Sequence, residues 1–491
     1  MPRQEIFELH PTGWEADPAD EIFRLSTLDY CVAQVYQNYA LFFKLADDDD
    51  KSRIIPVLKR GLEITLSQCR QLCGVLEPHP DGGFCSHKTR EDTVQFHVQW
   101  LDGPEDEGKY PSFQDLEDRY FTSQSLGDDG TWCVAPMTYG EKPEADPVNR
   151  IKAAAFKATF IRGGLVFMMH HHHYCNDVNG WAGEMHQLAD NCAAVWKKST
   201  DFPPWDPACL DNSRLSKPEP PMEQRVDGPV PPNRHPDHKL GQNLLFHLPK
   251  SKTAELKKLA SPEDGSYWIS SYDAYCAYIW RILTKHRAKL FDLNDAKQQQ
   301  QQLIWGHGIE MRSRFRHPRV PKRMQGNVFW AALSAQSPVP CPTVEEVISE
   351  APLSKLAWYV RQLTNGVTQE ALDAVLSAIA PIRDKTSLFI RVDSFPPLSN
   401  GITDWRQTRP YEADFGFGRP YAFRFPFETV TAGLTVIYPE RTNGAPPAGD
   451  DEGNEFCIAF EKEIARDLVE DPEWNRYFEF RGVDSEETVL V

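Results

Sequence analysis

Four consecutive histidines, His170 to His173, follow the apolar run GGLVFMM, and Asp177 comes four residues after the last of them. A neutral imidazole, with a pKa ordinarily near ~6.5, can accept a proton from a hydroxyl group at neutral pH. His173 differs from its neighbours because the stretch HYCND pairs it with a carboxylate at a fixed spacing. This pattern makes His173 a candidate general base.

Other interpretations of the histidine run have to be compared with this one. The run is internal and embedded in apolar sequence, which disfavours a purification tag. Alternate residues share one face of a strand, so His171 and His173 could supply two zinc ligands. No HExxH or CxxC motif supplies the remaining ligands at a familiar spacing, and we predict no metal site. We expect the other three histidines to be packed or hydrogen-bonded within the fold.

The elements around the histidines should hold His173 rigidly. Residues 152–173 are typical of two adjacent strands that turn at Gly163-Gly164. Apolar residues then recur every three or four positions from Trp181 to Trp196, which predicts a helix. His173 is therefore expected at the end of a buried strand, in a tight loop before a helix, where functional side chains are often exposed.

Both halves of the chain mix helix and strand patterns. We expect a buried helix within 25–45, an amphipathic helix over 54–76, and a helix over 270–290 that begins with a capping box of Ser270 and Asp273. Strands are predicted within 92–101, 302–314, 386–395 and 433–439. This mixture favours an α/β fold with a two-layer arrangement in each domain.

The length and composition indicate two domains. A chain of 491 residues with 41% hydrophobic content can bury more than one core. The proline-rich stretch 199–239 cannot form a regular helix and predicts an extended crossover. We therefore place an N-terminal domain at 1–198 and a C-terminal domain at 240–491.

The net charge and the cysteine content limit the possible binding partners and the cellular location of the protein. The net charge of −18 argues against nucleic-acid binding, so any anionic ligand must meet a local cluster of positive charge. The N-terminus has no signal-like core, and no apolar run reaches the ~18 residues of a membrane span. Eleven irregularly spaced cysteines suggest reduced thiols. We expect a cytoplasmic, monomeric protein without membrane contact.

Further motifs accompany HYCND in a recognisable order. The stretches are LSTLD (25–29), SSYDAYCAYIWR (270–281), EMRSR (310–314), MQGNVFW (324–330), TDW (403–405) and EADFGFGRP (412–420). Together with the H-x-x-x-D pattern they resemble the CoA-dependent BAHD acyltransferases, and more distantly chloramphenicol acetyltransferase and peptide-synthetase condensation domains. The sequence departs from the BAHD pattern at Phe417, where Trp is usual, at Glu310, where Asp is usual, and at Val178-Asn179, where Gly often follows the Asp. The long prolyl crossover is more similar to the fungal secondary-metabolite branch than to the plant branch.

The resemblance implies a fold and an activity. It implies two chloramphenicol acetyltransferase-like domains, each a mixed sheet flanked by helices, with the active site at their interface. The implied enzyme has no permanently bound cofactor and transfers an acyl group, most simply acetyl from acetyl-CoA, to a hydroxyl of a terpenoid, alkaloid or polyketide. A condensation or cyclisation enzyme that uses a carrier-protein thioester, and a binding module without catalysis, are the alternatives.

The resemblance also assigns roles to residues. His173 would be the general base, without a covalent acyl-enzyme, while Asp177 would turn away from it and pair with Arg312 or, as second choice, Arg314. Thr403 would donate a hydrogen bond to the oxyanion, and Trp405 would line the same position or simply pack in the core.

The remaining motif residues have structural or binding roles in this scheme. Asp414 would pair with an arginine, while Gly416 and Gly418 permit a tight turn. The helix N-terminus at Ser270 and Ser271 is a candidate site for the CoA phosphates, because free N–H groups point outward there. Lys250, Lys252 and Lys257 lie nearby in the sequence and could add charge, although for any one of them an ordinary solvated surface lysine is the favoured interpretation.

Overall fold

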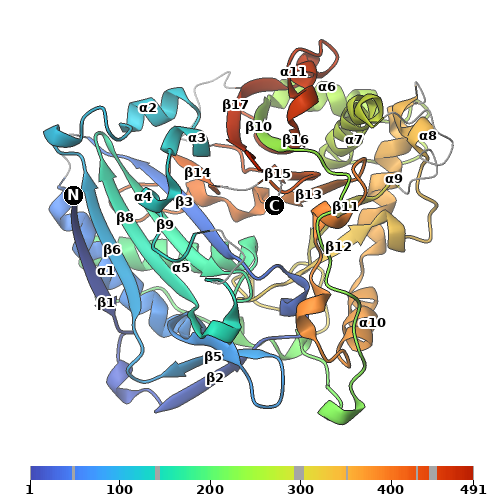
Figure 1. Cartoon of the computed structure of the whole chain (residues 1–491). Coiled ribbons are helices and arrows are strands. Elements are labelled where there is room, and N and C mark those ends of the chain that lie inside the picture. Colours follow the sequence, from blue (N-terminus) through green and yellow to red (C-terminus); the bar gives the residue numbers. More distant parts are fainter. Residues whose placement is uncertain are drawn as a thin grey trace.

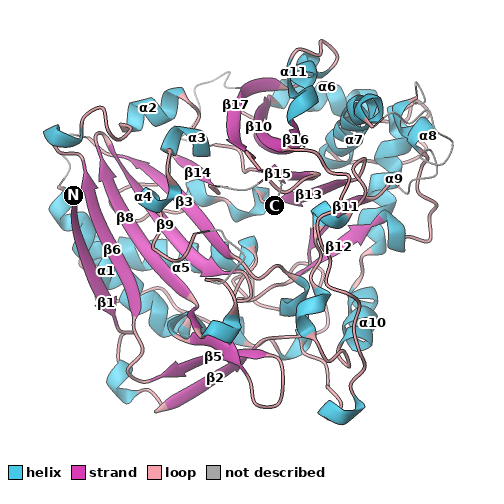
Figure 2. Cartoon of the chain, in the orientation of Figure 1, coloured by secondary structure: helices cyan, strands magenta, loops and turns pink. Residues whose placement is uncertain are grey.

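Two large β-sheets, one built mainly from each half of the chain, form the framework of the protein (Figure 1). The computed structural model describes residues 2–46, 50–138, 144–291, 303–349, 352–426, 430–441 and 451–489. Helices cover the sheets, and long irregular segments connect them (Figure 2). Within these described ranges, no helix is long and apolar enough to cross a membrane.

The N-terminal sheet has six strands and holds the histidine run near its centre. Its order is β1 (Arg3–Leu9), β6 (Val94–Leu101), β8 (Ala154–Ile161), β9 (Gly164–His172), β3 (Tyr36–Lys44) and β14 (Ala422–Arg424). Strand β9 pairs antiparallel with both β8 and β3. All nine residues of β9 are buried, which explains why its sequence is an almost continuous apolar run.

Helices pack on both faces of this sheet. Helices α1 (Lys51–Gln68) and α5 (Val178–Trp196) cover one face, where Phe167 and Met169 of β9 contribute to the core. The short helices α2 (Phe113–Asp118), α3 (Ser123–Leu126) and α4 (Asp129–Trp132) cover the other, where Val166 and Met168 are buried. The two-residue period of β9 therefore divides its side chains between two cores.

The C-terminal sheet has seven strands. Its order is β12 (Phe329–Leu333), β11 (Trp305–Glu310), β13 (Asn400–Asp404), β15 (Leu434–Ile437), β16 (Asn454–Glu461), β10 (Gly241–Leu248) and β17 (Glu479–Glu486). Its helices are α6 (Lys250–Ala260), α7 (Ser271–Leu290), α8 (Val344–Ile348), α9 (Leu353–Gly366), α10 (Gln369–Ile379) and α11 (Ala465–Val469). Trp280 of α7 packs on Trp305 of β11 and on Tyr359 of α9, so the helices and the sheet share one core.

The C-terminal half contributes one strand to the N-terminal sheet. Strand β14 belongs to the C-terminal half by sequence but pairs antiparallel with β3 at the edge of the N-terminal sheet. Its Phe423 stacks on Trp181 of α5, with ring centroids 5.1 Å apart. A third, four-stranded sheet consists of β2 (Asp20–Arg24), β5 (Phe84–Thr89), β4 (Val75–Pro78) and β7 (Ile151–Lys152). The crossover 199–239 contains short 3₁₀ turns and one isolated β-bridge, between Val226 and Ile382.

Most of the predicted elements near the active site are confirmed. The two strands that turn at Gly163-Gly164 are β8 and β9, the helix after Asp177 is α5, and the helix that begins at Ser270 is α7, with its capping box present. The amphipathic helix ends earlier than predicted, at Gln68, and β4 begins at Val75.

Two predicted elements are wrong. The segment 25–45 is not a helix, since it holds a 3₁₀ turn, Leu28–Cys31, followed by β3. A strand buried on both faces has no alternating pattern, so its apolar run cannot be told from a buried helix. The segment 386–395 is not a strand but two 3₁₀ turns, Lys385–Leu388 and Val392–Ser394. The Asp384 carboxylate accepts a hydrogen bond from the Thr386 N–H, and such local bonds compete with strand pairing.

Candidate active site

His173 lies at the junction of the two halves. Strand β9 ends at His172, and α5 begins at Val178, so His173 opens a short loop between two buried elements. Its side chain lines a cavity of about 290 Å³, together with Asp177, Thr403 and Trp405. These residues come from two segments more than 200 positions apart in the sequence, and the structure brings them to one place.

The surroundings of His173 favour a neutral ring with a free lone pair. Nδ1 lies 3.2 Å from the carbonyl oxygen of Asn176. Because a carbonyl only accepts, Nδ1 carries the proton in this contact and the neutral ring keeps its lone pair on Nε2. Burial lowers the pKa of His173 below its ordinary value, against weaker opposing effects of hydrogen bonds and of the Asp177 charge. At neutral pH the ring can therefore accept a proton.

Asp177 makes no hydrogen bond to His173. Its Oδ1 accepts from the Gly180 N–H at 2.7 Å, which caps α5. The Arg312 guanidinium donates to both carboxylate oxygens, at 3.0 and 3.1 Å, and the Val328 N–H donates to Oδ2 at 2.7 Å. The predicted partner, Arg312, is present, whereas Arg314 donates instead to the carbonyl oxygens of Thr364 and Val367. The carboxylate ties the HxxxD loop to the segment before β12.

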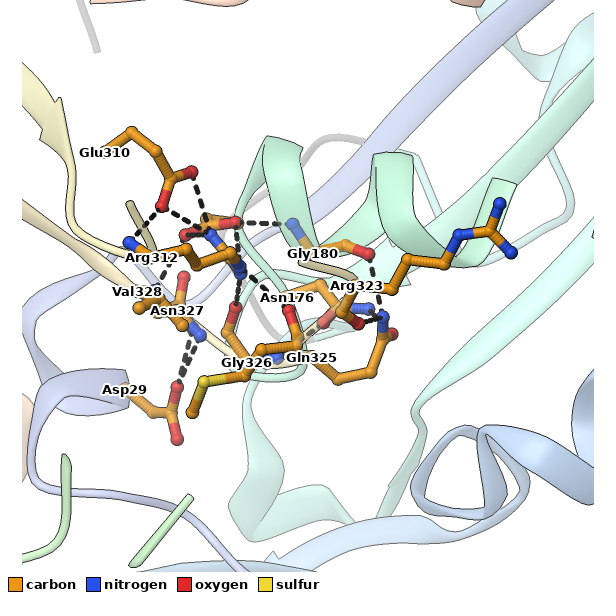
Figure 3. Close-up of polar contacts among 12 residues, drawn as sticks. Asp29, Asn176, Gly180, Glu310, Arg312, Arg323, Gln325, Gly326, Asn327 and Val328 are labelled. Atoms are coloured by element: carbon orange, nitrogen blue, oxygen red, sulfur yellow. Dashed lines mark hydrogen bonds and ion pairs between the residues drawn. The ribbon is translucent and has the colours of Figure 1, made fainter. Parts of the chain in front are cut away.

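Glu310 completes a buried charged group around Arg312 (Figure 3). Its carboxylate accepts from the Arg312 guanidinium at 3.0 Å and from the Arg312 N–H at 2.7 Å. Burial raises the pKa of Glu310, and the Arg312 charge acts against that rise. One guanidinium thus serves two carboxylates, which is the arrangement that a planar fork of donors allows.

Asn327 and Asp29 also hold His173, a role that the sequence did not predict. The Asn327 side-chain amide donates to the backbone carbonyl of His173 at 2.8 Å and to the Asp29 carboxylate at 2.9 Å. Asp29 accepts two more hydrogen bonds from Ser26, and Figure 3 shows Asn327 beside it. Asp29 lies in the motif LSTLD and Asn327 in the motif MQGNVFW, so these motifs were the signal in the sequence that could have identified the two residues.

Thr403 and Trp405 are linked to each other. The Trp405 indole Nε1–H donates to the Thr403 hydroxyl oxygen at 2.9 Å. With one lone pair occupied by this bond, the Thr403 O–H remains able to donate into the cavity that both residues line. Trp405 is 5% exposed and packs edge-on against Phe425 and Tyr438. Trp405 therefore packs in the core and also contacts Thr403.

The other three histidines have partners of their own, as predicted. His170 bonds with the Asn38 side chain at 2.7 Å, and His171 pairs with the Glu184 carboxylate at 2.7 Å. His172 donates to the carbonyl oxygen of Ala145. Burial lowers the pKa of both His170 and His172 to about 3, so these rings are neutral. Across the residues that the structure describes, no cluster of three His, Cys, Asp or Glu side chains could hold a metal ion.

The DFGFG segment lies outside the cavity and packs on the N-terminal half. Its Phe417 contacts Phe43 of β3 and Trp196 of α5, at centroid distances of 5.2 and 6.3 Å. The Asp414 carboxylate accepts from the Gly416 N–H and lies 3.9 Å from Arg419, with both side chains exposed. The segment therefore joins the halves without lining the cavity around His173.

We predict that Gly416→Ala lowers the free energy of unfolding by about 1–3 kcal/mol, whereas Gly418→Ala changes it little. Gly416 has a φ of +85°, and a Cβ there would lie 2.5 Å from Cβ of Trp196. At Gly418 the nearest atom would be 3.9 Å away, and the backbone is not left-handed. Urea unfolding of both variants tests this, and an equal loss of stability in the two would contradict it.

Ser270 and Ser271 are not brought to the cavity around His173. They lie at the N-terminus of α7, and neither is among the residues that line it. The Asp273 carboxylate accepts from both the N–H and the hydroxyl of Ser270, at 2.7 and 2.8 Å, and Arg361 pairs with the same carboxylate. The helix N-terminus is thus already capped by a negative charge.

The chain is similar to known proteins over most of its length. The sequence matches the Transferase family over residues 128–473 and the trichothecene 3-O-acetyltransferase-like N-terminal domain over residues 35–192. It is 54% identical to acetyltransferase FGR3 of Gibberella zeae over 484 residues, which cover 99% of this chain and 95% of that protein.

Solved structures show the same fold at low sequence identity. Fusarium sporotrichioides TRI101 in complex with coenzyme A and T-2 superposes with a TM-score of 0.73 at 19% identity, covering 94% of this chain and 100% of that one. Vinorine synthase superposes with a TM-score of 0.61 at 18% identity, covering 94% and 95%. These likenesses confirm the α/β, chloramphenicol acetyltransferase-like fold that the sequence predicts.

Proposed function

The chain belongs to the Transferase family and is an acyltransferase, and we propose that it moves an acetyl group from acetyl-CoA to a hydroxyl of a small secondary metabolite. The observation that carries this proposal is the position of His173. Its ring lines a cavity between the two halves, has a lowered pKa, and keeps its lone pair on Nε2 through the Nδ1 contact with Asn176. A terpenoid, alkaloid or polyketide alcohol suits the cavity, since its walls are largely apolar.

The proposed reaction is a direct transfer. Nε2 of His173 takes the proton from the acceptor hydroxyl, whose oxygen attacks the thioester carbonyl carbon. The tetrahedral intermediate then collapses, the C–S bond breaks, and the imidazolium returns the proton to the CoA thiolate. The products are an acetyl ester and free CoA, and His173 ends neutral. No acyl-enzyme forms, because both substrates are bound together.

The remaining residues stabilise charge and geometry in this scheme. The Thr403 O–H donates to the oxygen that becomes negative in the intermediate, with Trp405 holding the hydroxyl in place. Asp177 does not orient the histidine and instead holds the loop through Arg312. Asp414, Gly416 and Gly418 have no part in the chemistry.

Thr403→Val should lower kcat on the order of 10²-fold while leaving the KM for acetyl-CoA nearly unchanged, because it removes a donor needed mainly in the transition state. Thr403→Ser retains the hydroxyl and should recover most of the rate. Thr159→Val is a control of equal chemistry, since that buried hydroxyl has no hydrogen-bond partner among the described residues and Thr159, in β8, does not line the cavity. Steady-state kinetics test this prediction. An unchanged kcat in Thr403→Val would show that the Thr403 hydroxyl does not stabilise the transition state.

The test of the proposed function is product analysis. The purified protein is incubated with acetyl-CoA and an extract of the source organism, and mass spectrometry is used to find metabolites heavier by one acetyl group. A parallel reaction with an acetylated carrier protein separates the CoA-dependent activity from a condensation-type activity. Acetylated products that form only with the carrier protein would overturn the proposal.

We also propose that the protein acts as a cytoplasmic monomer, with domains at 1–198 and 240–491 joined by the crossover. No disulfide joins any of the cysteines that the structure describes, which is consistent with a reducing compartment.

A further inference from the structure

One face of the C-terminal sheet forms the floor of the cavity around His173. Strands β12, β11, β13 and β15 lie side by side there and all contribute residues to the lining (Figure 1). Gly306, Gly308 and Glu310 of β11 share the face that lines the cavity, because alternate residues of a strand point to the same side. Trp305 points the other way, into the core that the sheet shares with its helices. The shape of this floor is therefore set by every second residue of each strand.

Two very small residues lie beside Thr403 in this floor. Gly308 pairs with Ala331 of β12, and both residues line the cavity. Gly306 pairs with Gly401 in the parallel register of β11 and β13. Two residues further along both strands, Gly308 follows on β11 and Thr403 on β13. The floor is thus lowest next to the hydroxyl that donates to the oxyanion in the proposed reaction.

Gly308 leaves a space that the neighbouring glycines do not. A Cβ at Gly306 would lie 2.7 Å from Cδ2 of Leu333, and one at Gly401 would lie 2.8 Å from Cγ1 of Val392. No atom of the described residues lies within 4 Å of a Cβ placed at Gly308, and the backbone there is not left-handed. Neither packing nor backbone conformation therefore requires a glycine at 308. A glycine inside a strand often marks the close approach of a ligand.

The N-terminal half supplies a hydrogen-bond donor to the same cavity. Gln37 of β3 lines the cavity although the residue is 7% exposed. Its Oε1 accepts a hydrogen bond from the Tyr39 hydroxyl at 2.5 Å, which fixes the orientation of the amide. Its Nε2 makes no hydrogen bond to the residues that the structure describes. Because a buried N–H group without a partner costs free energy, this amide is suited to an oxygen of a bound ligand.

We propose that the acceptor is a fused-ring secondary alcohol with a second oxygen, whose rings lie on the floor at Gly308 and Ala331 and whose second oxygen accepts from Nε2 of Gln37. The inference rests on the proposed function and specifies the class of alcohol. The reacting hydroxyl must lie between His173 and the thioester carbonyl at Thr403, so the carbons that carry it lie near Gly308. The low part of the floor spans two neighbouring strands, ~4.8 Å apart, which suits the breadth of a ring better than a single methylene chain.

The binding of two matched alcohols tests the role of Gly308. The probes are decahydro-2-naphthol, a fused-ring secondary alcohol, and 1-decanol, a linear alcohol with the same number of carbons. We expect titration calorimetry to show that the unaltered protein prefers the ring alcohol. Gly308→Leu should weaken the binding of decahydro-2-naphthol at least about tenfold and change that of 1-decanol little, because the new side chain occupies the place of the rings.

Gly366→Leu is the matched control for Gly308→Leu. Gly366 is the last residue of α9, is exposed and does not line the cavity. A Cβ there also meets no atom of the described residues within 4 Å, and the backbone is not left-handed. The control should bind both alcohols as the unaltered protein does. Urea unfolding of Gly308→Leu should show no loss of stability, since its side chain enters open space.

A third probe tests the role of Gln37. The probe is 6-hydroxy-2-decalone, the same ring alcohol with a ketone on its second ring. The unaltered protein should bind it more tightly than decahydro-2-naphthol. Gln37→Met, which keeps the length of the side chain but removes the amide, should weaken binding of the ketone at least about tenfold and leave that of decahydro-2-naphthol nearly unchanged. Gln114→Met, at an exposed position of α2 outside the cavity, should change neither.

Direct binding separates this inference from the proposed function, because calorimetry requires no turnover. The inference is overturned if the unaltered protein binds neither ring alcohol, or binds 1-decanol as tightly as decahydro-2-naphthol. It is also overturned if Gly308→Leu weakens the ring and linear alcohols equally, or if Gln37→Met weakens the two ring alcohols equally. A protein that binds the three probes as expected but transfers no acetyl group from acetyl-CoA would refute the proposed function alone.

Discussion

Replacement of His173 by alanine should slow acetyl transfer by a factor of about 10²–10⁴, because an alcohol proton does not leave at neutral pH without a positioned base. The fold should remain, since the hydrogen bond that the described residues give the ring is a single one, to the Asn176 carbonyl, and the backbone of His173 stays bonded to Asn327. The measurement is kcat/KM with acetyl-CoA and the acceptor found by product analysis. His235→Ala, in the crossover 199–239, is the matched control and should retain full activity.

The pH dependence of the same reaction gives a second readout. Burial lowers the pKa of His173, so the ring stays neutral to a lower pH than a free histidine does. We expect kcat/KM to be flat through neutral pH and to fall only below about pH 6.5, the ordinary value, as the ring becomes protonated and can no longer accept a proton. A profile whose midpoint lies above that value would contradict the assignment of His173 as the base.

Asp177→Ala should cost about 3–5 kcal/mol of stability, because it leaves the buried Arg312 guanidinium with one carboxylate in place of two. The same change removes the N-cap of α5 and the acceptor of the Val328 N–H. Activity should fall together with stability, since the loop that carries His173 loses its anchor. Urea and thermal unfolding provide the measurement.

The double variant Asp177→Ala/Arg312→Met tests how much Arg312 still stabilises the fold through Glu310. In Asp177→Ala the guanidinium keeps Glu310 as its partner, whereas the double variant leaves the buried Glu310 carboxylate without a counter-charge and should be less stable than Asp177→Ala alone. If Asp177 were instead part of a catalytic triad, Asp177→Ala would reduce kcat with little loss of stability, and its assignment as the anchor of the loop would be wrong.

The sequence predicted the HxxxD loop well because strong local patterns flank it. The apolar run of β9 predicts a strand and the periodicity of α5 predicts a helix, so His173 is expected at the junction between them. The capping box of α7 was equally readable, since both of its partners lie within one turn. Arg312 could be assigned to Asp177 only through the family resemblance, because nothing in the spacing of residues 135 positions apart indicates contact.

Other features depend on tertiary structure and had no local signal. Strand β3 is buried on both faces, so its apolar residues show no strand period, and the helix predicted there was wrong. The ties from Asn327 to His173 and Asp29 join three distant segments.

The position of β14 has a consequence for any attempt to separate the two halves. A polypeptide that stopped within the crossover would lack β14, leaving the backbone of β3 without a neighbour on one side and Trp181 without the aromatic ring of Phe423. An exposed strand edge of this kind can pair with strands of other molecules, so the isolated first half should self-associate. The isolated second half would carry β14 without the sheet with which it pairs. We therefore expect that neither fragment folds independently, although the crossover resembles a domain linker.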